Sequence, residues 1–251
     1  MSCVSIRSCC IGEGRPKVIV PIVESTEAAV LQKAAEFSVL RADCVEWRVD
    51  LFAHPMDLSA VVHCLAKLRI ALKDQLLLVT LRTKAEGGSA APDHEAYLRF
   101  LHTVLDTDCA DLIDIEFFTA GADLPKLIED AHTAGACVVC SSHDFQKTPP
   151  RAELVARMAA MQRAGADLPK LAVMPQSRTD VLELLAATAE MADRHPETPV
   201  ITMSMGTLGA VSRLCGEAFG SAMTFANPGT ASAPGQISLE VVNAVLDNLK
   251  L

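Results

Sequence analysis

The chain alternates between short apolar runs and longer segments in which apolar residues recur three and four positions apart. The longer pattern is typical of helices that pack by one face. It is clearest at Leu58, Val61, Val62, Leu65 and Leu68. The apolar runs predict eight strands, over 17–23, 44–50, 75–82, 112–117, 136–142, 168–174, 199–205 and 221–225. The segments after them predict eight helices, over 27–40, 57–73, 93–105, 123–134, 151–164, 179–194, 209–216 and 237–249.

Strands that alternate with helices predict βαβ units and a parallel sheet. Eight units over residues 17–251 come to roughly 29 residues each, the size of one strand with its helix. The sequence therefore predicts the α/β class and a single-domain (β/α)8 TIM barrel. A doubly wound open sheet is the alternative, and no G-x-G-x-x-G follows the first strand to favour it. Residues 1–16 lie outside the repeat, and we expect them to close the bottom of the barrel.

Composition narrows the possible partners. Half of the 251 residues are apolar and 21% are charged, which predicts a folded chain with a large core. The net charge of −9 argues against binding to nucleic acid or to an anionic membrane. No signal segment and no apolar run of about 20 residues is present, so we expect the protein in the cytoplasm.

Nine cysteines are spaced irregularly, and we interpret them as reduced thiols. Cys137 and Cys140 form the one C-x-x-C motif, but on a strand they would point to opposite faces. They are therefore expected to form neither a disulfide nor a metal site. With no H-E-x-x-H motif either, we expect no metal.

Polar residues interrupt the predicted strands, and buried parallel strands should be apolar throughout. They are Glu46, Arg48 and Asp50 on the second strand, Arg82 on the third, Asp114 and Glu116 on the fourth, His143 after the fifth and Lys170 on the sixth. Barrel enzymes place their chemistry at the carboxyl ends of the strands. An internal network of salt bridges that only fills the barrel is the alternative interpretation of the acidic residues.

Lys170 fits a structural role less well. Burial lowers a lysine pKa from about 10.4, and a neighbouring Arg48 or Arg82 would lower it further. A neutral amine in such a site is a nucleophile suited to forming a Schiff base with a ketone. His143 is the one histidine of seven at a predicted strand end, and beside this lysine it is a candidate general acid and base.

Motifs along the chain resemble type I 3-dehydroquinate dehydratases, the Schiff-base enzymes of the shikimate pathway in aromatic amino-acid biosynthesis. They are Glu46-Trp47-Arg48, Leu81-Arg82, Glu86-Gly87-Gly88, Asp114-Ile115-Glu116, Ser142-His143-Asp144-Phe145, Pro169-Lys170 through Gln176, Met203-Ser204-Met205, Ser212-Arg213-Leu214 and Ser232 through Gln236. The order of all these motifs over some 190 residues is highly specific, although any one of them is weak. Ser142 departs from the asparagine usual in the family.

The resemblance implies a hydro-lyase that turns 3-dehydroquinate, a small anion, into 3-dehydroshikimate without a cofactor. Lys170 would form the iminium, His143 would act as general base and then general acid, and Glu86 would orient His143. The substrate would be bound by Glu46, Arg48, Arg82 and Arg213, with Met203, Met205 and Phe225 as an apolar wall. Ser232 and Gln236 would close the site from a lid over 226–236. The resemblance also implies a homodimer.

Two alternatives stay open. A Schiff-base aldolase on the same barrel would use the same lysine but would hold a phosphorylated sugar near the last two strands. A barrel that only binds a metabolite would not need a neutral lysine.

A Gly-rich segment and a repeated heptapeptide carry two further predictions. Glu86-Gly87-Gly88-Ser89 is predicted to be a flexible loop, too weak for a phosphate signature. The heptapeptide at 121–127 recurs unchanged at 165–171. Its context predicts a helix start with a solvated Lys126 in the first copy and a strand with Lys170 in the second.

Overall fold

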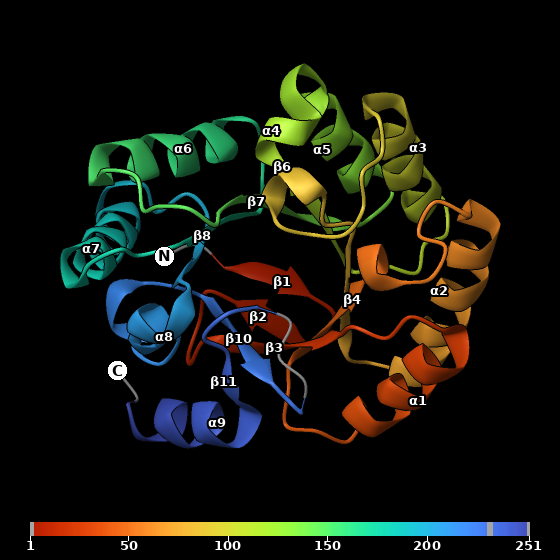
Figure 1. The fold of residues 1–251 in the computed structure, drawn as a ribbon, viewed down its shortest axis with the longest axis horizontal. Coiled ribbons are helices and arrows are strands. Elements are labelled where there is room, and N and C mark those ends of the chain that lie inside the picture. Colours follow the sequence, from red (N-terminus) through yellow and green to blue (C-terminus); the bar gives the residue numbers. More distant parts are fainter. Residues whose placement is uncertain (1–2, 230–232, 250–251) are drawn as a thin grey trace.

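The computed structural model describes residues 3–229 and 233–249. Parallel strands form a ring, and helices surround it (Figure 1). The strands are β3 (Lys17–Ile22), β4 (Cys44–Arg48), β5 (Leu76–Thr80), β6 (Leu112–Glu116), β7 (Cys137–Asp144), β8 (Leu168–Val173), β9 (Ile201–Ser204) and β10 (Met223–Asn227). From β3 to β9 each strand pairs in parallel with the next along the chain, and β10 pairs with β3. The last gap is bridged between Val200 and Ser221, so the predicted TIM barrel is confirmed.

Most helices lie where the apolar spacing predicts them. They are α1 (Glu27–Phe37), α2 (Leu58–Leu72), α3 (His94–Leu105), α5 (Leu124–Thr133), α6 (Arg151–Arg163), α7 (Arg178–Arg194) and α9 (Leu239–Asn248). Two more, α4 (Phe117–Ala120) and α8 (Gly206–Gly209), have a single turn, and β11 (Ile237–Ser238) pairs beside β10.

The helix predicted over 209–216 is wrong. In its place α8 is followed by two 3-10 turns, Ala210–Arg213 and Gly216–Phe219. Gly209 lies directly against the end of β9, where an added Cβ would meet the Ser204 carbonyl carbon at 2.4 Å. A regular helix running outward from Gly209 would lose this close packing, which holds the turn at the rim of the barrel.

The N-terminal segment closes the bottom of the barrel, as predicted. It forms an antiparallel hairpin of β1 (Val4–Ile6) and β2 (Cys9–Ile11), which lies across the middle of the ring in Figure 1. Ile6 and Ile11 are buried in one cluster with inward-facing residues from the starts of the strands. Arg7, at the hairpin turn, forms an ion pair with the buried Asp111 just before β6. The hairpin is therefore tied to the barrel by apolar packing and by charge.

The cysteine prediction is wrong at two positions, because Cys3 and Cys10 form a disulfide across the hairpin. These residues come within reach because β1 and β2 pair antiparallel, and the sequence pattern predicted neither strand. Cys137 and Cys140 remain free thiols. Cys140 packs among the outer core residues and Cys137 against the inner cluster, so they face opposite sides of the sheet as expected.

The two identical heptapeptides fold differently. The first spans a 3-10 turn, Gly121–Asp123, and the start of α5, where Lys126 is exposed and forms ion pairs with Glu129 and Asp130. The second enters β8, where Lys170 is 3% exposed. The residues that follow each copy explain the difference, since Ile128-Glu129-Asp130 continues a one-faced helix and Ala172-Val173-Met174 continues a buried strand.

Within the described residues, no helix combines the length and apolar character needed to cross a membrane.

Candidate active site

One cavity of about 190 Å³ opens at the carboxyl ends of the barrel strands. All predicted site residues that the structure describes line it: Glu46, Arg48, Arg82, Glu86, His143, Lys170, Met203, Met205, Arg213, Phe225 and Gln236. Ser232 lies outside the described residues. Residues far apart in the chain meet here because parallel strands end at the same rim of the barrel.

Lys170 lies on β8 with its side chain inside the barrel, while its neighbour Leu171 packs in the outer core. Its Nζ is 3.2 Å from Asp114 Oδ2 and 4.7 Å from the centre of the Phe225 ring. The contact differs from the sequence interpretation, which considered arginines as the neighbours of this amine. A buried carboxylate on β6 is its direct partner instead.

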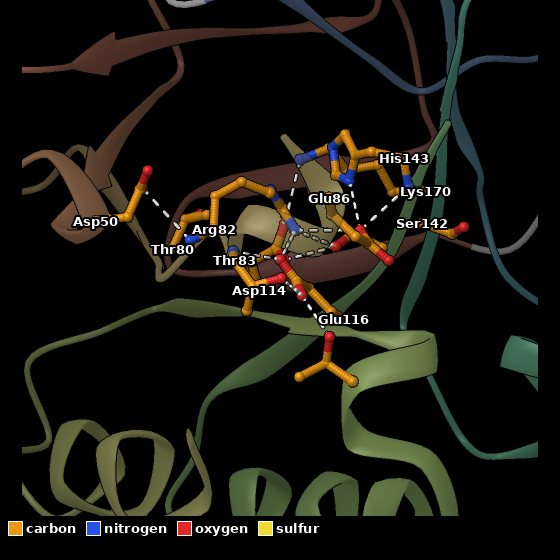
Figure 2. A network of polar contacts seen from close by, with 12 residues as sticks. Asp50, Thr80, Arg82, Thr83, Glu86, Asp114, Glu116, Ser142, His143 and Lys170 are labelled. Carbon is orange, nitrogen blue, oxygen red and sulfur yellow. Dashed lines mark hydrogen bonds and ion pairs between the residues drawn. The ribbon is translucent and has the colours of Figure 1, made fainter. Parts of the chain in front are cut away.

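Below the lysine, Arg82 holds a buried network of acids (Figure 2). Arg82 Nη2 donates to Asp114 Oδ2 at 2.7 Å, and Arg82 Nη1 donates to Glu116 Oε1 at 2.8 Å. Ser141 lies between them, since its Oγ accepts from Arg82 Nη1 at 2.9 Å and donates to Asp114 Oδ1 at 2.6 Å. Asp114 and Glu116 therefore do form internal salt bridges with Arg82, and the network forms the floor beneath the cavity.

His143, near the end of β7, is held by Glu86. Its Nδ1 lies 2.8 Å from Glu86 Oε2, and its backbone N–H donates to the same oxygen at 3.1 Å. Because Oε2 already accepts that backbone bond, we assign the ring proton to Nδ1, which leaves Nε2 free to accept a proton.

Charge and burial set the protonation of this pair. Burial lowers the pKa of His143 well below its usual value of 6.5, and Arg82 and Lys170 add to the effect. Burial also raises the pKa of Glu86 to about 8; Arg82 opposes this change, while Glu116 adds to it. The imidazole is therefore neutral at neutral pH, as a general base must be.

The loop that carries Glu86 is packed, so its prediction as a flexible loop is wrong. Lys84–Glu86 form a 3-10 turn that ends at Gly87 with φ of +81°. An added Cβ at Gly87 would lie 2.2 Å from the Phe145 ring, and one at Gly88 would lie 2.1 Å from the Arg82 carbonyl oxygen. The two glycines let the backbone approach closely enough to fix Glu86 under His143.

The polar residues of β4 are also held internally. Arg48 forms two hydrogen bonds with Asp50, from Nε at 2.7 Å and from Nη2 at 2.8 Å. Thr80 Oγ1 donates to Glu46 Oε1 at 2.9 Å. Ser142, the departure from the family pattern, accepts a hydrogen bond from Arg157 and is not among the residues that line the cavity.

Arg213 differs from the other cations of the cavity. Arg48, Arg82 and Lys170 each contact a carboxylate. In the described part of the chain, the contacts of Arg213 are with Met203 Sδ and the Pro234 carbonyl, and its Nε is buried without a partner. Burial lowers the pKa of Arg213 to about 10, so it stays charged at neutral pH. It is the guanidinium best placed to receive an external anion.

The described end of the candidate lid is anchored over the site. The Gly206 N–H donates to the Pro234 carbonyl at 3.2 Å, and Gly235 has φ of +75° where an added Cβ would lie 2.2 Å from the Gly206 carbonyl oxygen. The other end of the segment, Ala226–Asn227, belongs to β10.

Sequence reasoning missed three residues that line the cavity, Gly87, Phe145 and Ala172, whereas the lining residues Ala233 and Pro234 fall within the predicted lid. Phe145 and Ala172 lie two residues beyond His143 and Lys170 on the chain, so alternation along a strand could have indicated them. Asp114 was noticed as a strand-borne acid, but its contact with Lys170 depends on how β6 and β8 align on either side of β7.

Comparison with known proteins agrees with this geometry. Residues 18–251 match the model of the type I 3-dehydroquinase family. The chain is 45% identical over 249 residues to a 3-dehydroquinate dehydratase of Bacillus subtilis, covering 99% of this chain and 98% of that protein. It is also similar to the crystal structure of a type I 3-dehydroquinate dehydratase from Clostridium difficile with covalently modified comenic acid. That likeness has 42% identity, a TM-score of 0.96, and coverage of 99% and 98% of the two chains. A 3-dehydroquinate dehydratase structure from Enterococcus faecalis is 40% identical, with a TM-score of 0.93 and coverage of 99% and 100%.

Proposed function

The chain belongs to the type I 3-dehydroquinase family and dehydrates 3-dehydroquinate, and from this premise we propose that Lys170 carries the reaction through a Schiff base. The observation behind the proposal is the position of this one lysine, buried at the carboxyl end of the barrel beside a neutral imidazole. The related Clostridium difficile structure, with its covalently modified comenic acid, supports covalent chemistry in a site of this kind.

The proposed reaction needs no cofactor. Lys170 Nζ attacks the ketone carbon, and loss of water leaves an iminium whose positive charge draws electrons from the adjacent C–H bond. His143 Nε2 takes that proton, and the electron pair moves into an enamine. His143 then gives the proton to the departing hydroxyl, which leaves as water, and hydrolysis of the resulting iminium frees product and lysine.

The remaining lining residues hold the substrate in this scheme. Arg213 binds the carboxylate in a fork-to-fork pair, because its guanidinium contacts no carboxylate within the described chain. Glu46, Arg48, Arg82 and Gln236 line the cavity and hold ring hydroxyls. Met203, Met205 and Phe225 form an apolar wall that excludes water. Ser232 is assigned to the lid by the family motif alone.

Borohydride treatment in the presence of 3-dehydroquinate tests the proposal. It should reduce the iminium and leave a stable mass increase at Lys170, read by mass spectrometry of the digested protein. Turnover without any such label would refute the Schiff base. Labelling only with sugar phosphates would point to the aldolase alternative, which the family match does not favour.

Arg213→Lys should raise KM for 3-dehydroquinate about 10- to 100-fold and change kcat little. Lysine keeps the charge but loses the two parallel hydrogen bonds of the guanidinium, and a hydrogen bond to a charged group contributes about 1.5–3 kcal/mol. Steady-state kinetics measures both constants. Arg194→Lys, at an exposed position on α7, is the matched control. An unchanged KM for the Arg213 variant would contradict its role as carboxylate anchor.

Glu86→Gln should gain thermal stability relative to the wild type as the pH rises. The pKa of Glu86 is raised from 4.5 to about 8, so its stabilising contribution is fully present below pH 4.5 and is lost as the pH rises through 8. Glutamine does not ionise, so the stability of the variant has no such pH-dependent loss at this position. Melting temperatures at pH 5 and pH 9 should show the variant-minus-wild-type difference increasing, by roughly 2–4 °C for each 1 kcal/mol.

The exposed Glu95→Gln removes the same formal charge and controls for net charge. A difference for Glu86→Gln that follows this control across the pH range would contradict the raised pKa of Glu86.

The homodimer implied by the family resemblance and the cytoplasmic location expected from the sequence stay predictions. Sedimentation velocity of the purified chain tests the first, and cell fractionation tests the second.

A further inference from the structure

Asp114 is the carboxylate nearest to the reacting nitrogen, and the mechanism above gives it no role. Its side chain is 1% exposed, and its Oδ2 lies 3.2 Å from Lys170 Nζ. It does not line the cavity, so it touches the reacting atom from below while substrate would approach from above. We propose that Asp114 is a further catalytic residue, which stabilises the cation on Lys170 Nζ in the ammonium and again in the iminium. This inference rests on the proposed Schiff base.

The charge balance of imine formation favours such a partner. An ammonium and a ketone give an iminium and water, so the nitrogen carries one positive charge at the start and at the end, although it is neutral when it attacks. The iminium also keeps one N–H, which can continue to donate to Asp114 Oδ2 after the carbon–nitrogen bond forms. A fixed carboxylate in a buried site stabilises this cation without having to reorganise during the reaction.

Asp114 acts by charge and not as a proton acceptor. Burial opposes its ionisation, but Arg82 and Lys170 outweigh burial and lower the pKa of Asp114 to about 2. The proton that leaves the Lys170 nitrogen before attack therefore does not stay on Asp114 and is released to water.

Arg82 and Ser141 fix Asp114 and moderate its charge. Ser141 Oγ donates to Oδ1 at 2.6 Å. Arg82 Nη2 donates to Oδ2 at 2.7 Å, closer than the lysine (Figure 2). This moderation matters, because the later step converts the iminium into a neutral enamine. A carboxylate facing only Lys170 would stabilise the iminium so strongly that its conversion to the enamine would slow. A carboxylate shared with Arg82 favours formation of the iminium without preventing this later loss of charge.

Formation of the iminium adduct and its conversion to product should therefore respond differently to removal of the Asp114 charge. In Asp114→Asn, formation of the adduct should slow roughly 10²-fold, within the range for loss of one fixed electrostatic partner. Conversion of the adduct to product should not slow. Single-turnover reactions quenched with borohydride at successive times measure both phases by the mass label at Lys170.

Two comparison variants distinguish the effect of the Asp114 charge on Lys170 from a general disruption of the Arg82 network. Glu116→Gln changes an acid on the same strand that also binds Arg82 but has no contact with Lys170 among the described residues. Any slowing it causes should not fall selectively on adduct formation. Ser141→Ala keeps the carboxylate but removes its Oδ1 donor, and should slow adduct formation by a smaller factor, about 10-fold.

The outcomes are distinct. Adduct formation at the wild-type rate in folded Asp114→Asn would overturn the inference, and so would equal slowing of both phases. If Asp114→Asn does not fold, Ser141→Ala decides in the same way, and a wild-type rate of adduct formation overturns the inference. Absence of the label in the wild type would instead refute the Schiff base itself.

Discussion

Lys170→Ala should lower kcat by about 10⁶-fold, the scale seen when the nucleophile of a covalent enzyme is removed. Without Nζ no iminium can form, and the C–H bond beside the ketone keeps its ordinary low acidity. The fold should survive, because Arg82 continues to neutralise Asp114 at 2.7 Å after the lysine is gone. Formation of the conjugated enone product, followed by ultraviolet absorbance, measures the loss, and circular dichroism checks the fold.

The chain contains its own control for this substitution. Lys126 has the same six residues around it as Lys170, but it is exposed on α5. Lys126→Ala should keep wild-type activity, so sequence context alone cannot explain the effect at Lys170. Substantial turnover by Lys170→Ala would end the imine mechanism for this protein.

His143→Ala should still form the covalent adduct but lower kcat about 10²–10⁴-fold, the usual contribution of general acid–base catalysis. The lysine and its carboxylate partner remain in place, so the ketone can condense. The adjacent proton then has no positioned base, and the hydroxyl has no acid. Borohydride should therefore trap a larger fraction of this variant than of the wild type during turnover.

His132→Ala is a suitable control, since that exposed histidine on α5 pairs only with Asp167 among the described contacts. It should leave activity and trapping unchanged. A His143→Ala protein that folds but cannot be labelled at all would mean that the histidine acts mainly before the imine forms.

The barrel could be predicted from the sequence because its strands are buried on both faces and its helices on one. Such strands appear as unbroken apolar runs and such helices as a repeat near 3.6, and both signals survive without tertiary information. The failures lie where packing decides the conformation. At Gly209 contact with the end of β9 replaces a helix by turns, and at Gly87 contact with Phe145 fixes a loop that its composition suggests is flexible.

In the candidate site, too, the local sequence pattern identified some residues but not the contacts that form on folding. Lys170 and His143 stood out because they are polar residues at the ends of apolar strands. The contacts they make are not visible in that pattern, since the Asp114 contact and the Glu86 bond join residues 56 and 57 positions apart in the chain. The family resemblance implied the Glu86 contact but not the Asp114 contact. The pairing of Cys3 with Cys10 also depends on strands that the apolar pattern does not show.

The two identical heptapeptides allow the folded fraction of the protein to be measured by comparing the reactivity of Lys126 with that of Lys170. An amine-acylating reagent too large to enter the cavity of about 190 Å³ should modify Lys126 readily in the native state and reach Lys170 only when the barrel opens, because one amine is exposed and the other is buried. In the unfolded chain the two share the same immediate neighbours and should react alike. The ratio of the two labels in one digest would then report the unfolded fraction without an added standard.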